Sequence, residues 1–124
     1  MMEMTNNKGV LSLDISFDKG WKYSDDTVMQ LATAKGMINA GKNATIAQIC
    51  QSIAKQYKKC WNYMAGRAPG KTTGKMIKVL EEDGSNWNKI PYADRGCGCG
   101  GSMRSSSIGL LFWNDLPKLI GISI

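Results

Sequence analysis

Apolar residues recur at spacings of three and four along the segment that follows Thr45: Ile46, Ile49, Cys50, Ile53, Ala54, Tyr57, Cys60, Trp61 and Met64. Residues at these spacings share one face of an α-helix, so the pattern predicts a helix that buries this face. Lys55, Lys58 and Lys59 lie between them and are expected to point into solvent. Thr45 or Asn43 is the expected cap, because hydroxyl and amide side chains favour that position.

A preceding helix is expected from about Asp25 or Asp26 to about Ala40. Gly41 would end it, because glycine often follows the last residue of a helix. Gly36 weakens the middle of this helix, since glycine has a low helix propensity. The residues expected to face inward are Val28, Leu31, Ala32 and Ile38.

Three shorter helices are expected in the second half of the chain. One follows the loop 70–74, fails at residues 83–85 and carries Met76, Ile77, Val79 and Leu80. Another spans Gly101 to Phe112 and starts at a glycine-rich loop. The last follows Asn114 as a cap and carries Leu116, Leu119, Ile120 and residues 122–124. Because the periodicity is helical wherever it is long enough to judge, the predicted fold class is all-α.

Composition narrows the classes of partner. A chain of 124 residues with 43% hydrophobic residues fits one small domain. The formal charge of +6 favours an anionic ligand, but the lysines are scattered, so a nucleic acid is not the expected partner. Four irregularly spaced cysteines without any histidine argue against structural zinc. No apolar run approaches the length of a membrane span, so we expect no membrane partner and a cytoplasmic location.

Ser24, Asp25 and Asp26 form the first segment with candidate chemistry. They stand where a helix is expected to begin, and serine and aspartate at such a place commonly cap the helix. The same hydroxyl and carboxylate oxygens are also ligands that magnesium prefers. Adjacent helical residues point about 100° apart, so Asp25 and Asp26 would serve two neighbouring ions, or one ion and one water.

Glycine-rich segments supply the second kind of candidate chemistry. The run from Gly96 to Arg104 precedes an expected helix, where backbone amides bind anions such as phosphate; the alternative is a flexible turn. The stretch Ala65 to Thr72 satisfies a relaxed P-loop pattern, with alanine in place of the first glycine. A P-loop needs a strand before it, however, and the strongest helix of the chain stands there. Amides near 70–73 could still contact a phosphate.

Taken together, these segments resemble the ADP-ribosylglycohydrolase family. The matching stretches stand in the family's order: Trp21 to Met29 running into Leu31 to Ala34, Gly66 to Gly70, Ile90-Pro91, Gly98 to Gly100, Met103-Arg104 and Ile108 to Leu110. The resemblance is closest to the members that act on ADP-ribosyl-arginine. It implies one partial domain over residues 1–124, with 1–20 irregular and 21–124 matching the family.

The resemblance also implies the fold, the cofactor and the reaction. The fold would be an incomplete, orthogonal multi-helix all-α domain whose cleft holds two magnesium ions. The reaction would be hydrolysis of the N-glycosidic bond between ADP-ribose and an arginine of an ADP-ribosylated protein. Ser24, Asp25 and Asp26 match metal ligands of the family, and Asp25 or Asp26 would act in catalysis by orienting metal and water. The implied substrate-binding residues, for ADP-ribose, are Gly70, Lys71, Thr72, Gly98, Cys99, Gly100, Gly101, Ser102, Met103 and Arg104.

Two features of the family are missing from the sequence. Its opening helix with an acidic site residue has no counterpart in residues 1–8, and its distant Gly-Asp-Ser-Asp type segment, which supplies further metal ligands, does not occur. The chain is therefore expected to be a fragment or truncated copy of the domain. Three hypotheses follow: a segment of a magnesium-dependent hydrolase, an inactive remnant that at most binds ADP-ribose or a partner chain, and a nucleotide-binding loop at Gly70 to Thr72. The oligomeric state is left open.

Overall fold

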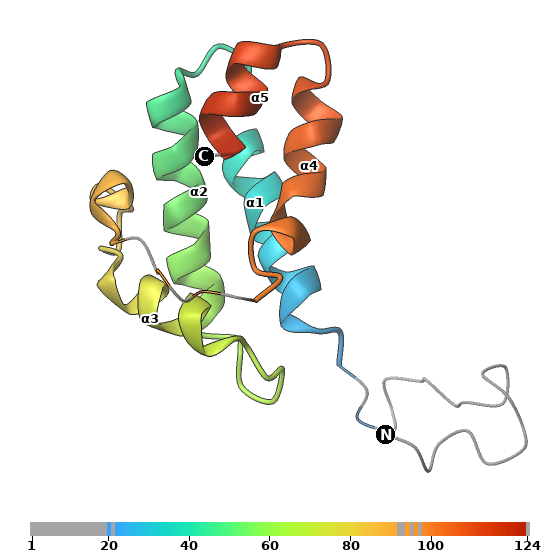
Figure 1. The fold of residues 1–124 in the computed structure, drawn as a ribbon, viewed down its shortest axis with the longest axis vertical. Helices are drawn as coiled ribbons and strands as arrows, with labels where there is room; N and C mark the ends of the chain where they lie inside the picture. Colours follow the sequence, from blue (N-terminus) through green and yellow to red (C-terminus); the bar gives the residue numbers. More distant parts are fainter. Residues whose placement is uncertain (1–19, 21, 92–93, 95, 97, 124) are drawn as a thin grey trace, which may run out of the picture.

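The computed structural model describes residues 20, 22–91, 94, 96 and 98–123. Within these residues the chain is entirely helical, which confirms the predicted all-α class. Figure 1 shows α1, α2, α4 and α5 side by side, with α3 running across one end of α2. The elements are α1 (Asp25–Ala40), α2 (Ile46–Trp61), α3 (Lys71–Val79), the 3-10 turn η4 (Trp87–Lys89), α4 (Ser102–Phe112) and α5 (Leu116–Ser123).

Helices α1, α2, α4 and α5 begin close to where the sequence places them. Thr45 caps α2 as expected: its side chain accepts a hydrogen bond from the Gln48 amide, while the Gln48 side chain accepts one from the Thr45 amide. Helix α1 ends before Gly41, whose φ of 89° suits glycine. The last helix is capped one residue later than predicted, because Asp115 rather than Asn114 accepts a hydrogen bond from the Lys118 amide.

Helix α3 begins inside a segment that the sequence predicts as a loop. The expected loop ran from residue 70 to residue 74, but the helix starts at Lys71, and Gly70 is its N-cap. Gly74 is part of the helix and lies against the Trp61 indole, where an added Cβ would be 3.1 Å from the ring. The glycine permits this close packing against the end of α2, so tertiary contact outweighs its low helix propensity.

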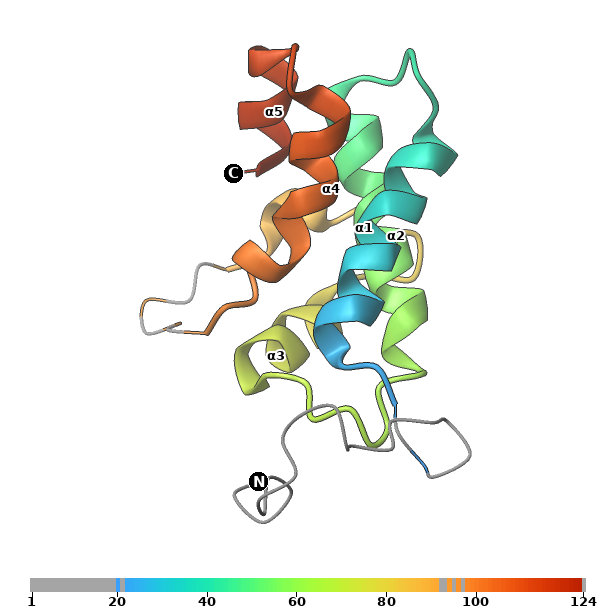
Figure 2. The same ribbon diagram turned by 90° about the vertical axis from the view of Figure 1, so that its right-hand side faces the viewer.

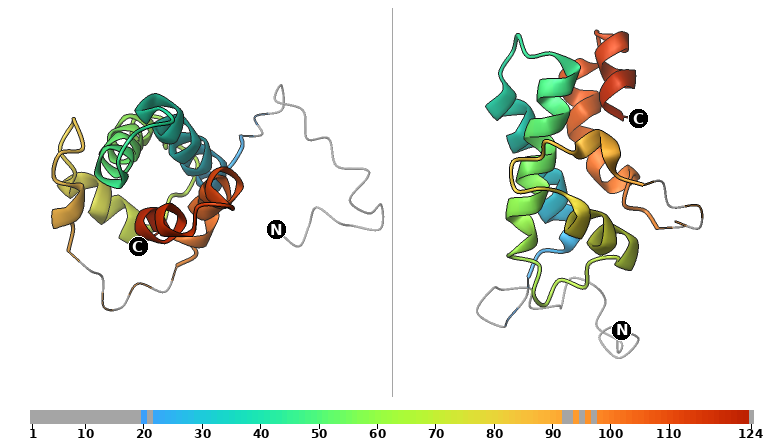
Figure 3. Two further views of the ribbon diagram at one scale, coloured as in Figure 1. Left: turned by 90° about the horizontal axis from the view of Figure 1, so that it is seen from above. Right: turned by 90° about the vertical axis from the view of Figure 1, so that its left-hand side faces the viewer.

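Helices α1 and α2 form an antiparallel pair that carries the core. The Ser52 hydroxyl donates a hydrogen bond to the Gly36 carbonyl oxygen at 2.8 Å, and Gly36 packs directly on the Ile53 backbone. One core cluster, near the start of α1, contains Val28, Met29, Ala54, Met64, Ile77 and Leu80. The other, toward the opposite end, contains Met37, Ala44, Ile49, Ile53 and Ile108. Figure 3 shows α1, α2, α4 and α5 grouped around this core.

The inward face of α1 differs from the prediction. Val28 and Ala32 are buried as expected, but Leu31 is 59% exposed and Ile38 is 76% exposed. The buried stripe runs instead through Met29, Thr33, Gly36 and Met37. Successive helical residues turn by about 100°, so a helix with apolar residues on two faces does not reveal from sequence which face α2 and α4 will cover.

Lys58 also departs from the prediction that it points into solvent. Its ammonium group donates hydrogen bonds to the carbonyl oxygens of Leu80 at 2.6 Å and Ile77 at 3.5 Å. These carbonyls lie at the C-terminal end of α3, where the last carbonyl groups of a helix lack partners within the helix. Lys58 therefore fastens the end of α3 to α2. Lys55 and Lys59 are exposed, as predicted.

Candidate ligand-binding site

Ser24, Asp25 and Asp26 stand at the first turn of α1, as the sequence predicts. Ser24 is the N-cap residue, but its side chain makes no capping hydrogen bond. Asp25 is half-buried and Asp26 is exposed. Neither carboxylate forms an ion pair with another described residue. The side-chain oxygens of this segment are therefore not consumed by capping α1.

Arg67 holds the backbone just before this segment. Its guanidinium donates one hydrogen bond to the Tyr23 carbonyl oxygen and another to the Tyr63 carbonyl oxygen, the latter at 2.9 Å. The same group lies 4.1 Å from the centre of the Tyr23 ring, a cation–π contact. Because Arg67 belongs to the loop that leads into α3, this contact joins the candidate metal segment to the candidate phosphate loop.

The N-terminus of α3 contains the predicted residues Gly70, Lys71 and Thr72. The N-cap Gly70 has no side chain that could cap the helix, and Lys71 and Thr72 are exposed. The first amide groups of a helix have no acceptor within the helix, and the helix dipole adds partial positive charge there. This end of α3 is therefore suited to an anion.

The glycine-rich segment before α4 lies against the first turn of α3. A Cβ placed on Gly100 would be 3.1 Å from the Thr73 hydroxyl oxygen and 3.8 Å from the Arg104 Nη2 atom. Gly98 and Gly101 have nothing within 4 Å of such an added atom. Residues far apart in the sequence thus meet here, and the glycines leave the backbone open to a ligand.

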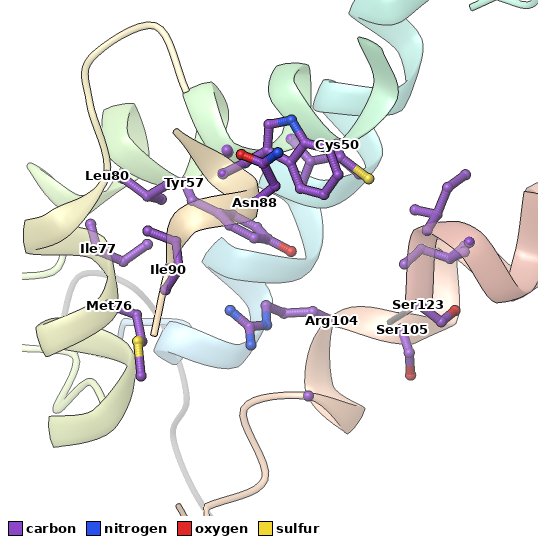
Figure 4. Close-up of a pocket in the computed structure, with 17 residues that line it drawn as sticks. Cys50, Tyr57, Met76, Ile77, Leu80, Asn88, Ile90, Arg104, Ser105 and Ser123 are labelled. Atoms are coloured by element: carbon purple, nitrogen blue, oxygen red, sulfur yellow. The ribbon is translucent and has the colours of Figure 1, made fainter. Parts of the chain in front are cut away.

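Ser102, Met103 and Arg104 form the first turn of α4 and point in different directions. The Ser102 hydroxyl donates to the Cys99 carbonyl oxygen at 2.9 Å, so it serves the local turn. Met103 packs against the core cluster that includes Met29. Arg104 alone of the three projects into a cavity, which Figure 4 shows. The seven predicted residues of this segment are therefore brought together, but they do not share one role.

The cavity beside Arg104 has a volume of about 650 Å³ and lies between α2, α3, η4, α4 and α5. The Arg104 guanidinium is 5.2 Å from the centre of the Tyr57 ring, and the Tyr57 hydroxyl is 2.7 Å from the Thr33 hydroxyl. Burial raises the pKa of Tyr57, so its hydroxyl stays neutral at physiological pH. Within the described residues Arg104 has no carboxylate partner, which leaves its charge available to an anion.

Magnesium fits the donor chemistry of the α1 segment in part. Hydroxyl and carboxylate oxygens are the hard ligands it prefers, and Ser24, Asp25 and Asp26 would hold it. Within the part of the chain that the structure describes, no group of three or more acidic, cysteine or histidine side chains could hold a metal ion. The segment therefore supplies a part of a coordination shell.

The structure gives three residues a place in the site that the sequence analysis did not assign. Arg67 and Thr73 stand in segments that the sequence singles out, 66–70 and 70–73, but their side-chain contacts were not predicted. Tyr57 was predicted to be buried, but nothing in the sequence linked it to Arg104, because α2 and α4 are far apart along the chain. The strand that a P-loop requires is absent from the described residues, where α2 and a turn precede Gly70.

The fold and the site define a helical protein with hydroxyl and carboxylate oxygens at the start of α1 and glycine residues before the first turns of α3 and α4. The chain belongs to the ADP-ribosylglycohydrolase family, whose model matches residues 3–123. It is similar to ADP-ribosylhydrolase ARH1 of Dictyostelium discoideum, with 42% identity over 86% of this chain and 29% of that protein. It is also similar to L444 of Acanthamoeba polyphaga mimivirus, which carries the name ADP-ribosyl glycohydrolase, with 34% identity over 84% of this chain and 21% of that protein.

The chain thus spans less than a third of the length of these two relatives. The family match covers residues 21–123 of the predicted region 21–124. The prediction that residues 1–20 are irregular falls almost entirely outside the described residues. None of the described helices is long and apolar enough to cross a membrane.

Proposed function

We propose that this chain contributes to the ADP-ribose site of a hydrolase that removes ADP-ribose from proteins. The observation that carries the proposal is the contact between Gly100 and Thr73, with Arg104 beside it. It brings the N-termini of α3 and α4 together near a guanidinium group. Amides at helix N-termini and an arginine are suited to the pyrophosphate of ADP-ribose.

The cofactor that we propose is magnesium, held through Ser24, Asp25 and Asp26, with two ions in a complete site. When bound, it would supply positive charge that favours deprotonation of a water and binding of ribose hydroxyls. Asp25 and Asp26 would hold their oxygens toward the ribose, because α1 fixes the backbone on one side and Arg67 fixes it on the other. This arrangement would position the reacting groups rather than move a proton.

The reaction adds water across the N-glycosidic bond. The water oxygen forms a bond to the anomeric carbon, and the bond from that carbon to the nitrogen of the side chain breaks. The leaving nitrogen takes a proton and departs as a neutral group, while positive charge develops transiently on the ribose, as in other glycoside cleavages. We propose arginine as the linkage, on the closer resemblance to the arginine-specific members, and an ADP-ribosylated protein as the substrate.

A cytoplasmic location is part of the proposal, because the chain has free cysteines and no expected membrane partner. Cys50, Cys60 and Cys99 are free thiols in the structure, as is usual in reducing compartments.

Thermal unfolding with and without ligands tests the site. The free energy of unfolding should rise by roughly 2.7 kcal/mol when a ligand is present at a hundred times its dissociation constant. We expect magnesium and ADP-ribose together to stabilise the chain more than either alone. The double variant Asp25→Asn/Asp26→Asn should lose the magnesium-dependent part, whereas the matched control Glu82→Gln, at an exposed carboxylate, should keep it.

The second candidate function is binding of ADP-ribose without hydrolysis. Among the described residues, Ser24 to Asp26 form one short segment of candidate metal ligands, and no group of three or more His, Cys, Asp or Glu side chains could hold a metal ion. This favours binding of ADP-ribose without hydrolysis. Release of ADP-ribose from an ADP-ribosylated peptide separates the two functions. Stabilisation by ADP-ribose without release supports the binding function, and no stabilisation by either ligand contradicts both.

A further inference from the structure

Helix α1 is apolar on two faces, and the structure covers one of them. Met29, Thr33 and Met37 are buried against α2 and α4. Leu31 and Ile38, seven positions apart and therefore on one side of the helix, are 59% and 76% exposed. In Figure 2, α1 stands in front of α2 with no described helix over its outer side.

A groove runs beside this outer face, between α1 and α2. It has a volume of about 440 Å³ and is distinct from the cavity beside Arg104. Leu31 contributes its apolar wall, and the exposed rings of Tyr23 and Tyr63 extend that wall. Exposed clusters of large apolar side chains commonly mark sites where another polypeptide packs.

The charge of the groove restricts what can occupy it. Lys35 and Lys59 are both exposed and line it from α1 and α2, respectively. None of the described residues that line it is acidic. An occupant that is apolar where it meets Leu31 and acidic where it meets the two lysines would match both features.

The length of the relatives indicates where such a partner comes from. The chain matches 29% of the Dictyostelium protein, so most of that protein lies outside the match and is long enough to supply a further helix. We propose that the outer face of α1, with Leu31, Ile38, Lys35 and Lys59, docks an amphipathic acidic helix from the remaining part of a family domain. Helix α1 is then a central helix, covered on both sides. The inference does not depend on the proposed activity.

A chimaera tests the proposal, in which this chain replaces the matched stretch of the Dictyostelium protein. In the present chain, Leu31→Glu should leave the melting temperature unchanged, because Leu31 is exposed. In the chimaera the same substitution should lower it by about 4 °C or more, because a carboxylate would be buried under the docked helix. Leu110→Glu is the matched control, since Leu110 is 79% exposed on α4. Equal effects of the two substitutions in the chimaera, or no effect of Leu31→Glu, would overturn the proposal.

Charge variants of the same chimaera test the role of the two lysines. Lys35→Glu/Lys59→Glu should lower its melting temperature by about 4 °C or more, since two favourable contacts become repulsive. Lys75→Glu/Lys78→Glu, the same charge change at exposed positions of α3, should not. Equal decreases for the two double variants, or no decrease for Lys35→Glu/Lys59→Glu, contradict the proposal. A dimer of this chain alone that Leu31→Glu abolishes would identify a second copy as the occupant and overturn the stated one.

Discussion

Gly36 of α1 meets Ile53 of α2 at a distance that leaves no space for a side chain. A Cβ on Gly36 would lie 2.6 Å from the Ile53 Cα atom and 2.8 Å from its backbone nitrogen. Backbone atoms in the middle of a helix cannot move aside without disturbing the helix. The only residue that fits this crossing is therefore glycine, although glycine weakens the helix that contains it.

Replacing Gly36 by alanine should destabilise the protein. The added methyl group would force α1 and α2 apart, at a cost of roughly 1 to 3 kcal/mol in the free energy of unfolding. Gly109→Ala is the matched control, because a Cβ there meets nothing within 4 Å in the interior of α4. It should gain up to roughly 1 kcal/mol from helix propensity. Urea denaturation measures the free energy of unfolding of both variants. A Gly36→Ala variant as stable as the unchanged protein would contradict this packing.

Lys58 should contribute to stability despite its charge. Lys58→Met keeps most of the apolar stem but removes the donor to the Leu80 and Ile77 carbonyls. We expect a loss of roughly 1 to 2 kcal/mol, because the hydrogen bonds involve a charged group. Lys55→Met, at an exposed position of the same helix, should change stability little. If the two variants unfold at the same urea concentration, Lys58 does not fasten α3.

Arg67 should fix the backbone before α1. Arg67→Ala removes its contacts with the Tyr23 carbonyl and ring, so the first turn of α1 should open more often. The Val28 amide, which donates to the Ser24 carbonyl oxygen, should then exchange hydrogen faster. The magnesium-dependent stabilisation should also decrease, because the oxygens of Ser24 to Asp26 would be less well positioned. Lys71→Ala, which removes an exposed cation nearby, is the control for exchange in this segment. Unchanged exchange in Arg67→Ala would rule out the positioning role.

Cys60 should be an unreactive thiol. Burial raises its pKa to about 11, whereas Cys99 is exposed. The thiolate is the reactive form, so iodoacetamide at about pH 8 should modify Cys99 well before Cys60. Mass spectrometry of the digested protein gives the order of modification. Faster labelling of Cys60 in the folded protein would contradict its burial.

The raised pKa of Cys60 also predicts how the free energy of unfolding depends on pH. The folded state favours the protonated Cys60 thiol, so Cys60 contributes to the free energy of unfolding. That contribution is fully present below the ordinary pKa of 9.0 and is lost as pH rises toward about 11. Urea denaturation at about pH 8 and about pH 10.5 measures the loss. Cys60→Ala should show a smaller decrease over the same interval. An identical pH dependence in the variant would assign the loss to other groups.

Helix boundaries could be predicted from the sequence because their causes are local. Thr45 and Gln48 cap α2 through atoms within three residues of each other, and Gly41 ends α1 through its own backbone conformation. The start of α3 could not be predicted, because Gly74 is helical only where Trp61 packs on it. Local propensity disfavours this helix start, and a contact with another helix reverses the balance.

The candidate site also has features that follow from local sequence and features that follow only from the packing of helices. The sequence by itself determined where side-chain oxygens stand, at Ser24 to Asp26, and where glycines precede two helices. That these segments bind magnesium and ADP-ribose stays a prediction. The sequence did not determine that Gly100 meets Thr73, that Arg104 lies over Tyr57, or that α2 covers the face of α1 with Met29 rather than the face with Leu31. Those relationships join residues distant in the chain, and only the packing of whole helices brings their atoms together.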